Sequence, residues 1–170
     1  MIYFPKVQFK TLVLIALMPM AIFIGCHKKE QYPIEPVLEY ISYYGTDTTD
    51  LNSNAIHKGL LTLGFTDGDG DIGLYDYEID PPYSANMYIF QYGIHKGVPI
   101  FIDTLSFRIP YLTPQGQDKS LKGEIDLDLD IIYVLPPFDS IDTVKYELYL
   151  LDRSLNQSNI ITSEEIPLLK

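Results

Sequence analysis

The sequence predicts an all-β protein that folds as an antiparallel β-sandwich. It is rich in residues that favour strands and turns, with 14 Tyr, 8 Phe, 11 Gly and 12 Pro among 170 residues. Beyond residue 36, apolar and polar residues alternate with a period of two in several short segments, and no amphipathic helix of ordinary length is evident. Six or seven short strands with turns between them indicate a sandwich, with a small barrel as the main alternative.

The first four expected strands are separated by clusters of turn-forming residues. Residues 37–44 are followed by the polar stretch 45–54, and residues 59–66 lead into the glycine-rich loop 67–73. Beyond Pro81-Pro82, residues 87–95 and 98–107 flank Lys96-Gly97. These two residues form a hairpin connection in which Gly97 can adopt a positive φ.

Three further strands are expected in the last third of the chain. Residues 123–134 begin with a strict alternation of acidic and aliphatic side chains, and Pro136-Pro137 ends that strand. Residues 143–151 form the next strand, and a short strand near residues 160–166 closes the chain. The side chains of residues 143–151 expected to point inward are Val144, Tyr146, Leu148 and Leu150.

The N-terminus has the features of a bacterial export signal. Lys6 and Lys10 precede an apolar run over residues 12–24, and Gly25-Cys26 follows. The run is too short to span a membrane as a helix. The sequence Phe23-Ile24-Gly25-Cys26 resembles the lipobox of bacterial lipoproteins, with Phe where Leu is commonest.

That resemblance implies a lipid-anchored protein. Residues 1–25 would be the lipoprotein signal peptide, residues 26–36 the acylated Cys26 with a flexible tether, and residues 37–170 the folded domain. We expect the acyl chains to hold the protein in the bacterial cell envelope, at the outer membrane. The net charge of −11 argues against nucleic acid as a partner.

The loop of residues 67–73 is the sharpest local signal in the sequence. Asp67, Asp69 and Asp71 alternate with glycines, and carboxylate oxygens are the ligands that Ca²⁺ prefers. With Asp67 as position one, Glu78 falls at position twelve, as in an EF-hand. Position six is Ile72 rather than Gly, and the flanks are strand-like, so an EF-hand is not expected.

We therefore take Asp67, Asp69, Asp71 and Glu78 as candidate calcium ligands. The alternative is an acidic turn in which the Asp side chains accept hydrogen bonds from nearby backbone N–H groups. The loop also contains the pattern G-x-G-x-x-G, but its aspartates would repel a pyrophosphate and no helix follows.

The sequence does not predict an enzyme. Glu124, Asp126, Asp128 and Asp130 form an acidic stripe with carboxylates about 6.7 Å apart, a spacing that any alternating strand offers, so a carbohydrate-active hydrolase is the weakest hypothesis. No Ser or Cys partner is suggested for His27, His57 or His95. The binding partner is expected to be an unknown protein or a glycan, and a carbohydrate-binding module could use Tyr83, Tyr88 or Tyr92.

Three stretches carry a further resemblance. They are LGFTDGDGDIGL (63–74), RIPYLTP (108–114) and KYELYLLDRSLNQSNIITSEEI (145–166), and they resemble a group of small lipoproteins common in the Bacteroidota. The last stretch is also similar to the final strands of bacterial Ig-like domains, which often close on an Asp-x-x-Gly-Asn-x-Ser turn. Here that turn runs from Asp152 to Ser158 with Leu155 where Gly is usual. The resemblance implies an Ig-like sandwich, a fold that serves many functions.

Overall fold

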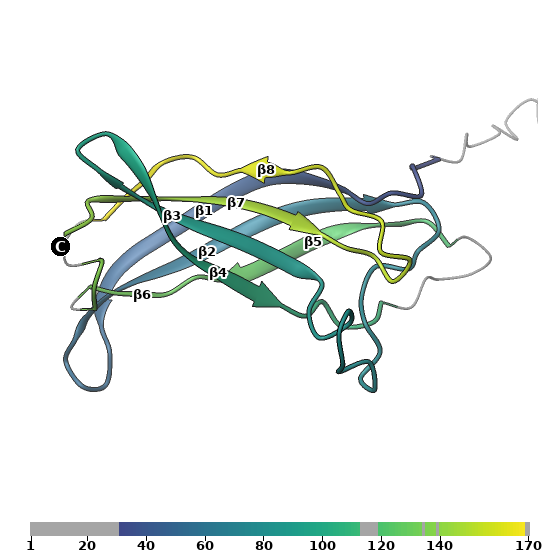
Figure 1. The fold of residues 1–170 in the computed structure, drawn as a ribbon, viewed down its shortest axis with the longest axis horizontal. Helices are drawn as coiled ribbons and strands as arrows, with labels where there is room; N and C mark the ends of the chain where they lie inside the picture. The colour runs from purple at the N-terminus through teal and green to yellow at the C-terminus, as the bar shows by residue number, and fades with distance from the viewer. Residues whose placement is uncertain (1–30, 113–118, 134, 139, 169–170) are drawn as a thin grey trace, which may run out of the picture. The chain divides into compact units, whose positions relative to one another are not determined.

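The computed structural model describes residues 31–112, 119–133, 135–138 and 140–168 (Figure 1). The chain divides into two units, Met1–Glu30 and Gln31–Lys170, and all described residues belong to the second. The expected signal peptide and Cys26 lie outside the described residues. Within the described part of the chain, no helix is long and apolar enough to cross a membrane.

The described residues form two antiparallel sheets that pack face to face, which confirms the predicted all-β sandwich. One sheet has the strand order β1-β2-β5, with β6 also paired to β2, and the other has the order β4-β3-β7-β8, with β9 also paired to β7. The strands are β1 (Val37–Thr49), β2 (Ala55–Asp67), β3 (Met87–His95), β4 (Val98–Phe107), β5 (Leu121–Asp128), β6 (Ile131–Ile132), β7 (Thr143–Leu150), β8 (Ile161–Thr162) and β9 (Ile166–Pro167).

The hairpin between β3 and β4 has the predicted bounds. Lys96 and Gly97 both have positive φ, at 53° and 80°. Two consecutive positive φ angles define the type I′ turn, whose twist matches that of the flanking strands.

Strand β1 is longer than the sequence predicts. The stretch 45–54 is expected to be a connection, but β1 continues to Thr49, with Asp47 opposite His57 and Thr48 opposite Ile56. Threonine is β-branched and favours strands, so its polarity does not end the ladder. The turn begins only at Asp50, whose Oδ1 accepts hydrogen bonds from the backbone N–H groups of Asn52 and Asn54, both at 2.8 Å.

Two other predicted strands are each divided into two. The segment 123–134 becomes β5 and β6, which pair with β2 in the same register. Between them, the N–H of Leu129 still donates to the carbonyl of Gly59 at 2.8 Å. The segment near 160–166 becomes β8 and β9. Between them, Ser163 donates its N–H to the carbonyl of Tyr146 and accepts the N–H of Tyr146 on Oγ.

The core lies between the two sheets. Val144, Tyr146, Leu148 and Leu150 of β7 are fully buried, which confirms their predicted inward orientation. They face buried residues of β2 such as Leu61 and Leu63. In β5 the aliphatic side chains of the alternating stretch are buried and the acidic ones are exposed, as the alternation predicts.

The start of β1 is fastened to the C-terminal part of the chain. The side chain of Asn159 accepts a hydrogen bond from the N–H of Leu38 at 2.8 Å and donates one to the Leu38 carbonyl at 3.0 Å. Both bonds together imitate a strand partner for β1, which otherwise has an open edge.

Candidate functional site

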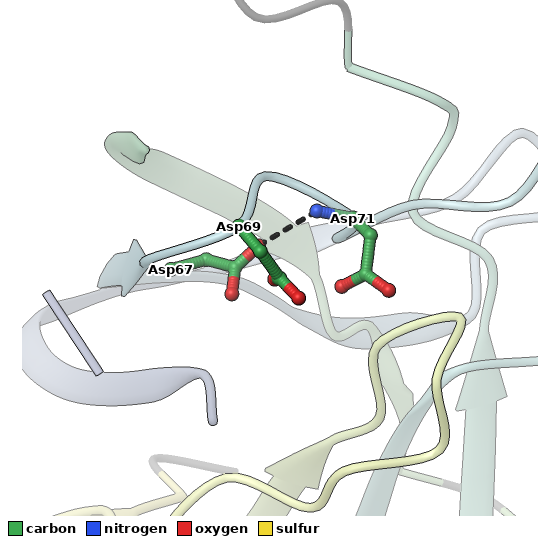
Figure 2. A group of neighbouring side chains, drawn as sticks. All are labelled: Asp67, Asp69 and Asp71. Atoms are coloured by element: carbon green, nitrogen blue, oxygen red, sulfur yellow. Dashed lines mark hydrogen bonds between the residues drawn. The ribbon is translucent and has the colours of Figure 1, made fainter. Parts of the chain in front are cut away.

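Asp67 is the last residue of β2 and is completely buried. Its Oδ2 accepts hydrogen bonds from the backbone N–H groups of Asp71, at 2.9 Å, and Ile72, at 3.3 Å (Figure 2). Its Oδ1 has no hydrogen-bond partner among the described residues. One oxygen therefore shapes the loop as in the acidic-turn interpretation, and the other is left buried and unpaired.

The structure brings Asp67, Asp69 and Asp71 together. One carboxylate oxygen from each lies within 4.8 Å of the others, and Figure 2 shows the three side chains on one side of the loop. The Oδ1 atoms of all three are buried and lack a hydrogen-bond partner in the described part of the chain. Three carboxylates this close could hold a metal ion, which would also compensate the cost of burying unpaired carboxylate oxygens.

Two glycines allow the loop to pack tightly against its surroundings. A Cβ at Gly68 would lie 2.4 Å from the carbonyl oxygen of Tyr32, and a Cβ at Gly73 would lie 2.3 Å from that of Pro110. Gly73 also has a φ of 92°. A side chain at either position would collide with the backbone of a neighbouring segment, so both positions require glycine.

The end of the loop packs into the core, and the turn that follows is held by hydrogen bonds from Arg108. Ile72 is completely buried, which explains why an aliphatic residue occupies this position instead of the EF-hand glycine. The Arg108 guanidinium donates to the carbonyls of Tyr75, Glu78 and Tyr83 and so holds the following turn.

Glu78 is not part of the group formed by the three aspartates. Its Oε2 accepts a hydrogen bond from the N–H of Tyr75 at 2.6 Å. Of the four candidate ligands, the structure therefore gathers three and gives the fourth carboxylate a local backbone partner.

The turn from Asp152 to Ser158 forms a second wall of the site. Asp152 is buried and accepts hydrogen bonds from the backbone and side-chain nitrogens of Asn156, at 2.7 and 2.8 Å. Leu155 adopts a φ of 65°, the conformation usually taken by Gly in this turn. The turn reaches the loop through Ser154, whose Oγ donates to Asp71 Oδ2 at 2.7 Å.

Arg153 fixes the same turn from the other side. Its N–H donates to the Asp71 carbonyl at 3.2 Å. Its guanidinium carbon lies 4.4 Å from the ring centre of Tyr75 and 5.0 Å from that of Tyr111, both within cation–π range. The sequence shows no sign that Arg153 and Ser154 meet Asp71, because they lie far apart along the chain.

The electrostatics of the loop favour a bound cation. Burial, and then the neighbouring Asp69 carboxylate, raise the pKa of Asp67 to about 6. The pKa of Asp69 is also raised, by burial and by Asp71. The donor set contains only carboxylate oxygens, which suits a hard divalent cation and not the nitrogen and sulfur sites of zinc.

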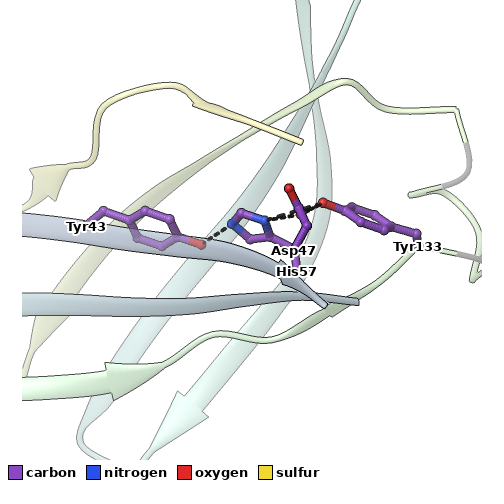
Figure 3. Close-up of polar contacts among 4 residues, drawn as sticks. All are labelled: Tyr43, Asp47, His57 and Tyr133. Carbon is purple, nitrogen blue, oxygen red and sulfur yellow. Dashed lines mark hydrogen bonds and ion pairs between the residues drawn. The ribbon is translucent and has the colours of Figure 1, made fainter. Parts of the chain in front are cut away.

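A second polar group, which the sequence does not reveal, joins β1, β2 and the residue after β6. The His57 side chain is almost fully buried, with its Nδ1 2.8 Å from Asp47 Oδ1 and its Nε2 3.0 Å from the Tyr43 hydroxyl (Figure 3). The Tyr133 hydroxyl donates to the same Asp47 oxygen. A neutral His57 satisfies the contacts when Nδ1–H donates to Asp47 and Nε2 accepts from Tyr43.

Asp47 lies opposite His57 only because β1 extends beyond its predicted end at residue 44. Because the sequence predicts a connection over residues 45–54, it does not predict the register that sets Asp47 opposite His57. The linked Asp, His and hydroxyl do not form an activated nucleophile, since burial raises the pKa of both Tyr43 and Tyr133 and so disfavours phenolate. The four residues are linked by hydrogen bonds across β1, β2 and the residue after β6, and we call them the polar clamp: Tyr43, Asp47, His57 and Tyr133.

The tyrosines considered for sugar binding are distributed over two places. Tyr88 and Tyr92 lie on the outward face of β3, where Tyr88 stacks on Tyr149 at 5.3 Å between ring centres and Tyr92 meets Phe101 edge-on at 5.9 Å. Tyr83 lies in the turn before β3. The two places do not combine into one aromatic platform.

The other histidines of the sequence have simpler positions. His95, at the end of β3, contacts the Ser140 carbonyl through Nδ1 at 3.2 Å. His27 lies outside the described residues.

Comparison with known protein families, curated proteins and solved structures finds no match to this chain.

Proposed function

We propose that this chain is a non-enzymatic, lipid-anchored module of the bacterial cell envelope that binds a partner and is stabilised by Ca²⁺ in the loop 67–73. The calcium part rests on three carboxylates that each offer an oxygen within 4.8 Å of the others. Each of them also has one buried oxygen without a hydrogen-bond partner among the described residues, and Asp67 is completely buried. The anchor is supported by the lipobox-like sequence ending at Cys26.

Calcium suits this loop better than a more demanding cation. Ca²⁺ takes six to eight oxygens in flexible geometry, whereas Mg²⁺ requires a near-ideal octahedron. Three carboxylates supply part of that shell, and backbone carbonyls and water would supply the rest. Because the protein donates few charged ligands, we expect a dissociation constant of about 10⁻⁴–10⁻³ M, as in extracellular modules.

A non-enzymatic role is supported by the hydrogen bonds of the two described histidines, His57 and His95. His57 is enclosed between Asp47 and Tyr43, and His95 contacts a backbone carbonyl. The hydroxyl of Ser140, beside His95, donates to the Pro137 carbonyl at 3.0 Å and not to the histidine. Among the described contacts of the two histidines, no serine hydroxyl or cysteine thiol is paired with the imidazole as a nucleophile would be.

The calcium proposal is tested by thermal unfolding of the metal-free protein during a calcium titration. Ca²⁺ at about 10 mM should raise the melting temperature. This concentration is a hundredfold excess over a dissociation constant of about 10⁻⁴ M, at which binding only to the folded state adds about 2.7 kcal/mol. The triple variant Asp67→Asn, Asp69→Asn, Asp71→Asn should lose this response, and Asp69→Asn alone should weaken it.

The matched control is Asp126→Asn. Asp126 is an exposed carboxylate on β5 outside the group, so its replacement should leave the calcium response unchanged. Equal shifts in the wild type and the triple variant would mean that calcium only screens the net charge.

Carbohydrate binding is the second candidate, and the outward face of β3 favours it. Tyr88, Tyr92, Phe101 and Tyr149 form ring contacts there and leave part of their faces open to solvent. Aromatic rings of this kind can stack on sugars. Binding to a panel of soluble glycans that is lost in Tyr88→Ala and Tyr149→Ala would support this candidate, and no binding in the wild type would remove it.

A further inference from the structure

One side of the sandwich is open where the edge strands of the two sheets face each other. β4 ends one sheet, and β5 with β6 ends the other. Residues from β4, from β5 and from the segment around β6 line a common groove with a volume of about 350 Å³. At about 30 Å³ per water molecule, it has room for about twelve waters.

The surface of this groove combines apolar side chains with polar ones. Leu105 and Phe107 line it from β4, and Ile132, Leu135 and Phe138 line it from the opposite side. Leu135 is about half exposed, at 51 %. Leu105, Phe107 and Phe138 are partly buried against the core. The groove therefore offers a small, partly covered apolar surface.

The backbone of β4 can accept another strand over part of its length. Its first half is protected by Pro99 and by a bulge opposite Gln91 and Tyr92, both of which discourage pairing. The second half, from Thr104 to Phe107, pairs regularly with β3, and no described strand covers its other edge. The Thr104 N–H donates to Asp103 Oδ1 at 2.7 Å, so a new strand would pair beyond Thr104. The residues that line the groove come from this half and its border, so the open edge and the apolar surface coincide.

The charges around the groove have one sign. Asp103, Asp128 and Asp130 line it, and none of its described lining residues is Lys, Arg or His. The whole chain has a net charge of −11. A second copy of the chain would bring further carboxylates to this place, whereas a basic partner would be attracted.

We propose that this groove binds an extended segment of another protein in which apolar residues alternate with Lys or Arg. The segment would add to β4 as a strand, place its apolar side chains in the groove and its basic side chains beside the three aspartates. This inference specifies the partner of the binding module proposed above, and it does not require calcium.

The test uses synthetic peptides and the full chain in a mild detergent, with and without calcium. The probe is a blocked seven-residue peptide of alternating Leu and Lys, followed by amide hydrogen exchange and by titration. It should slow exchange at residues 104–107 and bind with a dissociation constant in the micromolar to millimolar range. A peptide of alternating Leu and Glu, and a Leu-Lys peptide methylated on alternate backbone nitrogens, should each bind at least tenfold more weakly.

Variants of the protein locate the contact. The triple variant Asp103→Asn, Asp128→Asn, Asp130→Asn should weaken binding of the Leu-Lys peptide at least tenfold. The matched control Asp126→Asn, Glu164→Gln, Glu165→Gln removes the same charge from residues outside the groove and should change affinity less than twofold. Melting temperatures of both variants verify that they are folded.

Several outcomes would overturn the inference. They are no binding at millimolar peptide, equal binding of the Leu-Glu peptide, equal weakening in the control variant, and protection elsewhere than at β4. Self-association of the chain through β4, seen by sedimentation, would assign the groove to a second copy instead. Calcium stabilisation without peptide binding would leave the calcium proposal intact and remove only this one.

Discussion

Asp67 combines two roles that usually belong to different residues. One carboxylate oxygen closes the turn through two backbone N–H groups, and the other remains buried and unpaired beside Asp69. The cluster of Asp67, Asp69 and Asp71 is predictable because the sequence itself shows the alternation of Asp with Gly. The burial of Asp67 is not, because it depends on packing from residues distant in the chain.

This burial predicts a dependence of stability on pH in metal-free buffer. The folded pKa of Asp67, about 6, lies above its ordinary value of 3.8, so between these values the folded state binds more protons than the unfolded state. The free energy of unfolding should therefore decrease as pH rises from about 4 to 7, with about 2–3 kcal/mol from this carboxyl.

Denaturant unfolding at both pH values measures the effect. Asp67→Asn should flatten the dependence, whereas the exposed Asp126→Asn should retain it. If the free energy of unfolding of the wild type increased over this pH range, the raised pKa of Asp67 would be contradicted.

Leu155 gives a second prediction for a single residue. Its left-handed conformation costs a non-glycine residue roughly 1–2 kcal/mol, and its side chain is 45 % exposed. Leu155→Gly should stabilise the protein by about 0.5–1 kcal/mol after the greater entropy of glycine in the unfolded chain is subtracted. Leu155→Ala keeps the strained φ and should bring no gain in the same denaturation experiment.

At the scale of elements, the prediction is most accurate where the chain alternates strictly. The bounds of β3 and β4 are predictable because the turn Lys96-Gly97 and the flanking alternation agree. The extension of β1 is not, because Asp47 and its threonine neighbours are polar and their partners cannot be seen in the sequence. Strand pairing with β2 and the contact to His57 decide that segment.

The β1–β2 ladder contains a glycine pair that makes room for the clamp. Gly45 lies opposite Gly59, and a Cβ at Gly59 would lie 2.0 Å from the Tyr43 hydroxyl oxygen and 2.9 Å from the Leu129 carbonyl oxygen. Gly59→Ala should therefore destabilise the protein by about 1–3 kcal/mol.

Gly64 offers a control on the same strand. A Cβ there would meet the nearest atom, Ile41 Cδ1, at 3.4 Å, an ordinary contact. Gly64→Ala should change the free energy of unfolding by less than about 1 kcal/mol. Equal losses in the two variants would show that the clamp is not what makes Gly59 necessary.

At the scale of the whole molecule, the fold class is predictable from the sequence and the contacts between distant segments are not. Period-two alternation and turns indicate a sandwich from local sequence alone. The meeting of Ser154 with Asp71, and of β4 with β5 and β6 around one groove, depends on how the sheets pack.

The lipid anchor predicted from residues 1–26 can be tested directly. Mass spectrometry of the membrane fraction should find Cys26 as the N-terminal residue, carrying a diacylglyceryl group. Cys26→Ser should release the protein from acyl-dependent membrane binding, since two or more acyl chains are needed for stable anchoring. An unmodified chain that retains residues 1–25 would contradict the lipobox interpretation.

The hydrogen bonds between Asn159 and Leu38 bear on how the sandwich would respond to a pulling force. β1 begins beside Asn159, near the end of β7, whereas β9, the last described strand, pairs with the start of β7. The hydrogen bonds of β1 to β2 run across the strand. A pull between these two ends would load those bonds in shear, so that many must break together, with the two bonds of Asn159 at the first point of strain. A domain tethered through its N-terminus would thus bear tension along its longest ladder without opening bond by bond.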